Sequence, residues 1–219
     1  MTSVGTEASS EDRAETFLEW TRTNSRALSI AGGVILVAAC VYWGFAKSRQ
    51  IQAANAEKAL LVAKQSIQAA NPQLAQTDLN TVYSRYGSTP AGVEAAMLLA
   101  QIDFDAGKYQ DGISILEKAA GAGPAATLQS TILSLEGDGY SQMGKPADAA
   151  KKYEDAANAT RYETEKGFQL AKAARAYQAA GNVVKAKEVW TALATDPKYV
   201  SMASEAHVRL GELEVQAAK

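Results

Sequence analysis

Cysteine and histidine are nearly absent from this sequence of 219 residues, which contains one of each, Cys40 and His207. A lone cysteine cannot form an intramolecular disulfide, and no Cys/His set exists that could hold a metal. The sequence also offers no plausible serine–histidine–acid set and no glycine-rich phosphate loop after a strand. We predict that His207 occupies an inward-facing position of the last helix and packs there. We therefore expect no enzymatic activity, no cofactor and no small-molecule substrate.

A strong charge of either sign is also missing, because 22 basic residues face 24 acidic ones and the net charge is −2. This balance gives no electrostatic reason to expect nucleic acid as a partner. Proline is scarce, with five residues, β-branched runs are absent after residue 46, and alanine is abundant there. Such a composition favours helices. The sequence after residue 46 therefore predicts one all-α domain of ordinary size over residues 47–219.

Residues 28–46 form the longest apolar run, without a charged residue or a proline. As an α-helix this run rises roughly 28 Å, close to the ~30 Å hydrocarbon thickness of a bilayer. Tyr42 and Trp43 stand near its end, where amphipathic rings favour the headgroup level. We interpret the run as a single transmembrane helix. A tail over residues 1–27, with a short amphipathic helix, precedes it.

Two alternatives to a membrane anchor stay open, a buried core helix and a cleaved signal peptide. The acid-rich segment before the run and the length of the run favour an uncleaved anchor. Ser25, Ser29 and Gly33 recur at four-residue spacing and predict a face on which another membrane helix can pack. Basic residues on the two sides are nearly balanced, so charge leaves the orientation open.

After the apolar run the chain repeats itself every 37 residues, as shown by Gly107, Gly144 and Gly181. Small and bulky residues recur at fixed offsets before and after these glycines, namely Ala100, Gly137 and Ala174, and Leu116, Tyr153 and Trp190. Small residues let two helices approach closely, while bulky residues fill the space between hairpins. Each glycine is expected to end a helix in a left-handed turn. The pattern predicts stacked helical hairpins and a capping helix from Val200 to Ala218.

These units resemble tetratricopeptide repeats, with a period three residues longer than is usual in that family. The early tryptophan of the family is missing, and Ala96, Leu133 and Leu170 stand in its place. The resemblance predicts an all-α fold, with one N-terminal transmembrane helix, a tetratricopeptide-like α-hairpin solenoid and a C-terminal capping helix.

The chain as a whole is similar to the single-pass ancillary subunit of the bacterial Sec translocon. The likeness lies in the segment Phe17-Leu-Glu-Trp20, in Asn24, and in an apolar run ending Tyr42-Trp43. It implies a non-enzymatic protein of the bacterial inner (plasma) membrane, with a cytoplasmic N-terminus and a periplasmic repeat domain. It also implies translocon subunits and a periplasmic chaperone as partners.

The first helices of the repeats are expected to line a concave wall that binds a partner protein. The candidate residues are Met97, Gln101, Phe104, Asp138, Ser141, Gln142, Arg175 and Gln178. Their mixture of polar and apolar side chains is typical of a peptide groove. Alternatively, the wall is merely solvated, and the chain is a structural or scaffold subunit of a large inner-membrane complex, held through its transmembrane helix.

Overall fold

The computed structural model describes residues 20, 21 and 23–217, apart from the side chains of residues 27, 28, 31, 32 and 217. Within this part of the chain the secondary structure is helical and contains no strand. The predicted all-α class is confirmed. The chain divides into two compact units, residues 1–51 and 52–219. Most of the predicted amphipathic helix lies outside the described residues, and the division into 1–27, 28–46 and 47–219 stays a prediction.

Helix α2 runs without interruption from Ser25 to Gln68, over 44 residues. The apolar run is thus one part of a longer helix that continues through charged residues such as Lys47 and Glu57. Among the described residues, no helix combines the length and the apolarity that crossing a membrane requires. This finding overturns the predicted transmembrane helix and the predicted single-pass location in the inner membrane.

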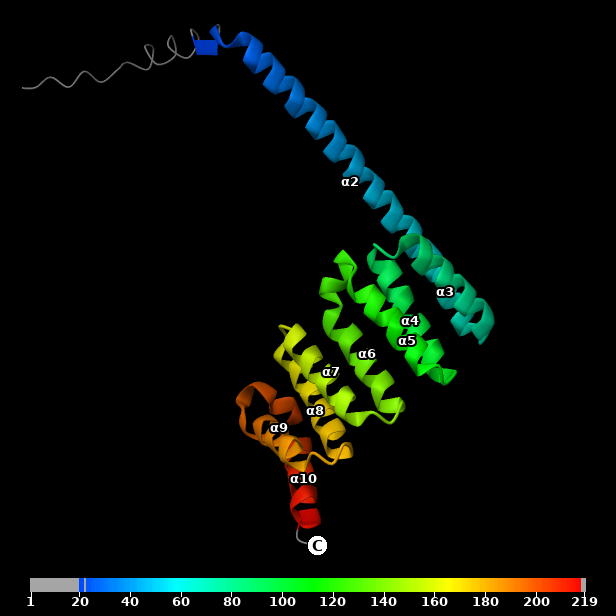
Figure 1. Cartoon of the computed structure of the whole chain (residues 1–219), viewed down its shortest axis with the longest axis vertical. Coiled ribbons are helices and arrows are strands. Elements are labelled where there is room, and N and C mark those ends of the chain that lie inside the picture. The colour runs from blue at the N-terminus through cyan, green and yellow to red at the C-terminus, as the bar shows by residue number, and fades with distance from the viewer. Residues whose placement is uncertain (1–19, 22, 218–219) are drawn as a thin grey trace, which may run out of the picture. The chain divides into compact units, whose positions relative to one another are not determined.

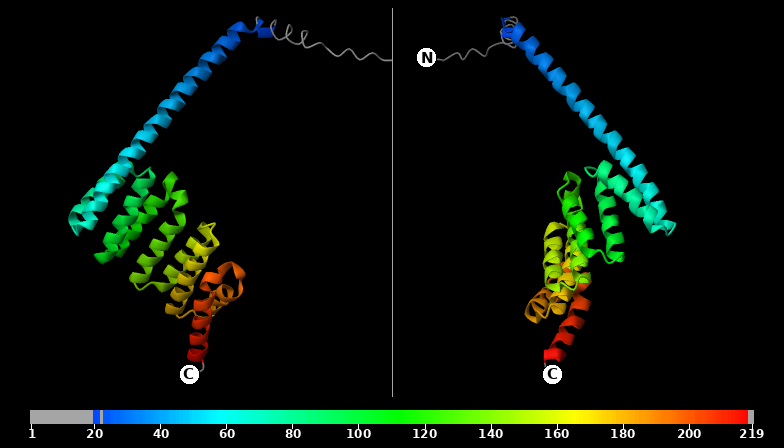
Figure 2. Two further views of the ribbon diagram at one scale, coloured as in Figure 1. Left: turned by 180° about the vertical axis from the view of Figure 1, so that it is seen from behind. Right: turned by 45° about the vertical axis from the view of Figure 1, so that its right-hand side comes forward.

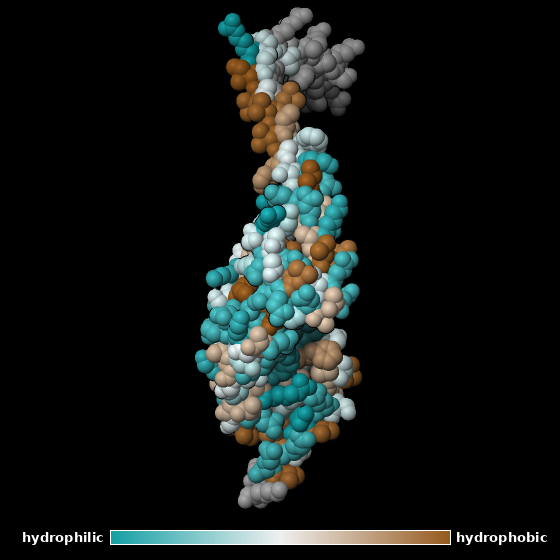
Figure 3. Space-filling model, turned by 90° about the vertical axis from the view of Figure 1, so that its right-hand side faces the viewer, coloured by the Kyte–Doolittle hydropathy of each residue, from teal (hydrophilic) through white to brown (hydrophobic). Residues whose placement is uncertain are grey.

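The described apolar side chains of residues 33–46 are exposed, for example Val37 at 65% and Trp43 at 70%. Figure 3 shows hydrophobic side chains gathered along this part of α2, whereas the visible face of the hairpins is mostly hydrophilic.

The second unit is a stack of helices that follow one another in chain order, each packed on the next (Figures 1 and 2). After the end of α2 come α3 (Pro72–Tyr86), α4 (Pro90–Asp105), α5 (Tyr109–Ala120), α6 (Gln129–Gln142), α7 (Pro146–Ala159), α8 (Glu163–Ala179), α9 (Val183–Thr195) and α10 (Val200–Ala217). Two short 3-10 helices, Gly123–Thr127 and Pro197–Tyr199, join the hairpins. This arrangement confirms the predicted α-hairpin solenoid.

The three repeat glycines have the expected left-handed backbone, with φ of 76° at Gly107, 71° at Gly144 and 76° at Gly181. After each glycine the next backbone N–H donates to the carbonyl five residues earlier, at N···O distances of 2.7, 2.9 and 2.8 Å. This bond is the signature of a helix closed by a left-handed C′ residue. The sequence period therefore corresponds to a repeated backbone turn.

Small residues do bring the two helices of a hairpin together. A Cβ atom added at Gly137 would lie 2.6 Å from Cε1 of Tyr153 on the facing helix. In the hairpin α4–α5 the small residue lies on the second helix and the aromatic residue on the first. A Cβ added at Gly112 on α5 would lie 2.5 Å from Cε1 of Phe104 on α4. The predicted close approach at Gly137 is confirmed.

The last helix packs against α9 and α8, and its inward face carries Met202, Ala206 and Leu213, all buried. His207 is exposed, so its predicted inward position is wrong. The reason is geometric. Successive residues of an α-helix are about 100° apart, so the neighbour of the fully buried Ala206 points away from the stack.

Candidate binding site between the first helices of two repeats

A cavity of about 270 Å³ opens at the wall formed by α4 and α6, the first helices of two successive hairpins. Its lining includes five of the predicted site residues, Gln101, Phe104, Asp138, Ser141 and Gln142, together with Asp105, Leu135 and Tyr153. The structure therefore brings these five together at one place.

Helical spacing explains how each helix contributes to the cavity. On α4, Gln101, Phe104 and Asp105 stand at positions i, i+3 and i+4, which share one helix face. On α6, Leu135 and Asp138 stand three residues apart, and Gln142 follows at the next turn. Because α4 and α6 are equivalent helices of neighbouring repeats, these two faces meet.

Phe104 forms the floor of the cavity instead of projecting from it, since its side chain is only 5% exposed. Its ring lies against the α-carbons of Gly112 and Gly139, where added Cβ atoms would come within 2.5 and 2.7 Å of ring carbons. It also belongs to the same buried cluster as Ile113 and Leu116. Replacing Phe104 would therefore disturb the core as well as the cavity.

Asp138 is the centre of a polar network beside the cavity. The Tyr153 hydroxyl donates a hydrogen bond of 2.6 Å to its Oδ1 atom, and Lys172 Nζ lies 2.7 Å from the same atom. Lys172 Nζ also donates to Ser134 Oγ at 2.9 Å and lies 4.6 Å from the centre of the Tyr153 ring. Burial, followed by the hydrogen bond to Asp138 and the charge of that carboxylate, raises the pKa of Tyr153. The hydroxyl therefore remains a donor, and the network holds Asp138 in place.

The sequence interpretation did not assign Lys172 and Tyr153 to the site. Tyr153 was expected to fill space between hairpins, and its hydroxyl reaches Asp138 only because Gly137 lets the ring approach α6. Lys172 is partly buried, and no feature of the sequence separates it from the exposed lysines of the chain.

Three predicted site residues lie apart from the cavity lining. Met97 and Gln178 are half-buried. Arg175 is exposed, and its Nε and Nη2 atoms donate to Glu205 Oε1 at 3.1 and 2.6 Å. Its guanidinium also lies 6.0 Å from the Trp190 ring. Arg175 is thus engaged within the chain.

The predicted small-residue stripe lies on α2 in the first unit. Ser25 and Ser29 are exposed, and Ser29 Oγ donates to the Ser25 carbonyl at 2.7 Å. At Gly33 an added Cβ would meet nothing within 4 Å.

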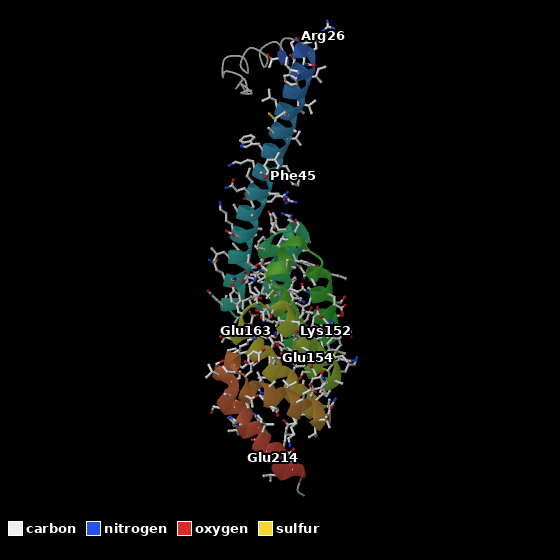
Figure 4. All side chains as sticks on the ribbon, turned by 90° about the vertical axis from the view of Figure 1, so that its left-hand side faces the viewer. Arg26, Phe45, Lys152, Glu154, Glu163 and Glu214 are labelled. Atoms are coloured by element: carbon white, nitrogen blue, oxygen red, sulfur yellow. The ribbon has the colours of Figure 1, made fainter. Side chains whose placement is uncertain are left out.

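Ionisable groups away from the cavity are engaged in the packing of the helices. Glu136 on α6 is 2% exposed, and its Oε2 atom lies 2.5 Å from Lys152 Nζ on α7, a residue labelled in Figure 4. Burial raises the pKa of Glu136, while the hydrogen bond and charge of Lys152 oppose that shift. Asp103 is buried and accepts a hydrogen bond of 3.2 Å from Gln76 Nε2. Burial raises its pKa, with Lys108 lowering it and Asp111 raising it further.

Asp103 and Asp105 face different sides of α4, because one is buried and the other lines the cavity. Within the described residues, no group of three or more His, Cys, Asp and Glu side chains is placed to hold a metal ion. The arrangement at the cavity supplies hydrogen-bonding groups and charge around an apolar floor.

The chain belongs to the tetratricopeptide repeat-like domain family, whose sequence profile matches residues 19–134 and, in a second match, residues 45–172. Such repeats are typically non-enzymatic modules for protein–protein interaction. Among curated proteins, no match was found.

Solved structures show the same fold. MamA from residue 41 to its end, from Desulfovibrio magneticus RS-1, superposes with a TM-score of 0.57 at 15% identity, over 74% of this chain and 85% of that chain. Nearly identical TPR-like repeats of a Podosopora anserina kinesin light chain give a TM-score of 0.53 at 18% identity, over 72% and 89%. A further crystal structure of MamA gives 0.51 at 20%, over 72% and 81%. These comparisons establish the tetratricopeptide-like fold of the chain.

Proposed function

We propose that this chain is a non-enzymatic scaffold that binds a segment of a partner protein in the cavity between α4 and α6. The observation that carries the proposal is the convergence of five wall residues, from two repeats, on one hollow with polar sides and an apolar floor. Helical repeats commonly use surfaces of this kind to bind extended segments of other proteins.

The size of the cavity favours a polypeptide side chain over a metabolite. At about 270 Å³ it falls below the ~300–1,000 Å³ of pockets that enclose small molecules. Gln101 and Gln142 are exposed at its edge, and each amide can both donate and accept hydrogen bonds. Two such amides suit a peptide backbone, which also offers donors and acceptors in pairs.

The resemblance of the sequence to the ancillary subunit of the Sec translocon supports a partner from the protein-translocation machinery or a chaperone. We propose such proteins as the first partners to test.

A second candidate function is that of a structural subunit in a larger assembly, bound through α2. The exposed apolar side chains of residues 33–46 support it, because another protein would have to cover them to remove them from water. The small residues Ser25, Ser29 and Gly33 would let a partner helix approach α2 closely.

The experiment that separates these functions is site-specific photo-crosslinking in the full chain. A photoreactive residue replaces Ser141 at the cavity, Lys151 on α7 as a matched exposed control, or Val37 on α2. We expect one defined protein to crosslink at Ser141 and not at Lys151. A co-purifying protein that crosslinks at Val37 alone would favour the second function, and equal crosslinking at Ser141 and Lys151 would contradict the first.

A further inference from the structure

Most charges on the wall of first helices are neutralised by ion pairs within the chain. The pairs are Glu94 with Lys64 at 2.5 Å, Asp138 with Lys172 at 2.7 Å, and Arg175 with Glu205 at 2.6 Å. Asp105 differs from these residues. It is exposed, it lines the cavity, and within the described part of the chain it has neither a hydrogen bond nor an ion pair.

The basic residue nearest to Asp105 in sequence does not neutralise it. Lys108 stands three positions later, just beyond the turn glycine, and no ion pair joins the two side chains in the described structure. Asp138 on the opposite side of the cavity is a second carboxylate, and its charge is already shared with Lys172. The cavity therefore presents a net negative charge to an incoming group, which disfavours an anion.

The apolar part of the lining restricts the occupant further. Phe104, Leu135 and Tyr153 line the cavity together with the polar residues, and Phe104 and Tyr153 are buried. Lysine and arginine combine an apolar stem with a charged head, so either can cover such a floor and still reach a carboxylate. Arginine suits the site better, because its planar guanidinium can hydrogen-bond to Asp105 and to the amide oxygen of Gln142 at the same time.

We infer that the cavity receives a basic side chain, arginine in preference to lysine, from an extended segment of the partner protein. The guanidinium binds Asp105 and the rim amides, and the stem lies over Phe104 and Leu135. The inference rests on the proposed function, since it names the chemistry of the segment that the wall binds.

The test is an NMR titration of the full chain with four small probes, the N-acetyl methylamides of arginine, lysine, glutamine and glutamate. The signals followed are the side-chain amides of Gln101 and Gln142 and the backbone amide of Ser141. We expect saturable shifts with arginine, weaker binding with lysine, and none with glutamate. The glutamine probe tests whether charge matters, because it is polar and neutral.

Variants of the full chain then assign the effect to one carboxylate. Asp105→Asn should weaken arginine binding about tenfold, the size expected for the loss of one charge-assisted hydrogen bond. Asp148→Asn, on the exposed first turn of α7, is the matched control and should leave binding unchanged. Added salt should weaken binding to the parent protein more than to the Asp105→Asn variant.

Equal shifts with arginine and glutamine, or an unchanged affinity of Asp105→Asn, would overturn the inference. If those results came together with a defined protein crosslinked at Ser141, the proposed function would stand and only the basic side chain would be wrong. If Ser141 also failed to crosslink, the proposed function would fail with it.

Discussion

The hairpins α6–α7 and α8–α9 have the same turn and the same period but different interiors. In α6–α7 the facing helices enclose the Glu136–Lys152 ion pair and the hydrogen bond from Tyr153 to Asp138. In α8–α9 the interior is mostly apolar, with several alanines, Val189 and Leu193 in the same buried cluster as Trp190, which is completely buried. The comparison shows that the turn glycine and the small residues determine the backbone of a hairpin, while its interior can be polar or apolar.

The two interiors have different energetic consequences. Burial of Trp190 is favourable through the apolar area removed from water, whereas the charges of Glu136 and Lys152 lose hydration that their attraction only partly replaces. The polar interior coincides with the hairpin that lines the cavity, where Asp138 is held by Tyr153 and Lys172. We therefore expect the hairpin α8–α9 to contribute mainly to stability. The hairpin α6–α7 is expected to contribute the geometry of the site.

The strongest test of the apolar interior is Trp190→Ala, which we expect to lower the free energy of unfolding by about 3–5 kcal/mol. The large cavity left between α8, α9 and α10 is the physical reason. Chemical denaturation of the full chain measures the loss. Val184→Ala on the same helix is the control, because Val184 is 81% exposed and should change stability little.

Gly137→Leu tests the close approach of α6 and α7 and should lower the free energy of unfolding by about 3 kcal/mol. Any side chain at this position meets the Tyr153 ring, which is itself enclosed by the hairpin. The matched control is Gly211→Leu on α10, where an added Cβ meets nothing within 4 Å. Similar denaturation midpoints for the two variants would contradict the proposed packing of α6 on α7.

Lys152→Met tests the buried ion pair and should cost about 2 kcal/mol at pH 7. This is less than the ~3–5 kcal/mol typical of a fully buried pair, because Lys152 is partly exposed. The exposed neighbour Lys151→Met is the control.

The stability lost in Lys152→Met should increase from low pH to pH 7. Burial already raises the pKa of Glu136 in the folded parent protein above its pKa in the unfolded chain. Between these two pKa values the folded state therefore binds more protons than the unfolded state. Stability consequently falls as pH rises through this range. Without Lys152 that pKa rises further. The difference between variant and parent should therefore be largest near pH 7 and vanish below the unfolded pKa, where Glu136 is protonated in both states. Denaturation at pH 7 and pH 4 measures this, and a constant difference would contradict it.

Gly144→Ala and Gly181→Ala test what the two hairpins share. Each places a Cβ in the left-handed region, at φ of 71° and 76°, and should cost about 1 kcal/mol. The two losses should be equal within error, because neither position has an atom within 4 Å of an added Cβ. A clear inequality in thermal or chemical denaturation would show that the turns are not equivalent.

The sequence alone determined the repeated part of the fold. Left-handed glycines, the proline at the start of several helices and the alternation of small and bulky residues act locally, so the period of 37 residues predicted where the hairpins turn. The repeat phase also predicted that Gln101, Phe104, Asp138, Ser141 and Gln142 belong to one wall, and these five residues line one cavity. Binding at that wall stays a prediction.

Only the tertiary structure decided how deeply each of these side chains lies and what it contacts. Phe104 belongs to the core because Gly112 and Gly139 leave room for its ring, and Lys172 reaches Asp138 from the next hairpin. His207 is exposed, one residue away from the inward face. The physical reason is that the periodicity of a sequence predicts the inward face of a helix with an uncertainty of about one residue, which is about 100° around the helix axis. Burial depends instead on the side chain that the neighbouring helix places at that point.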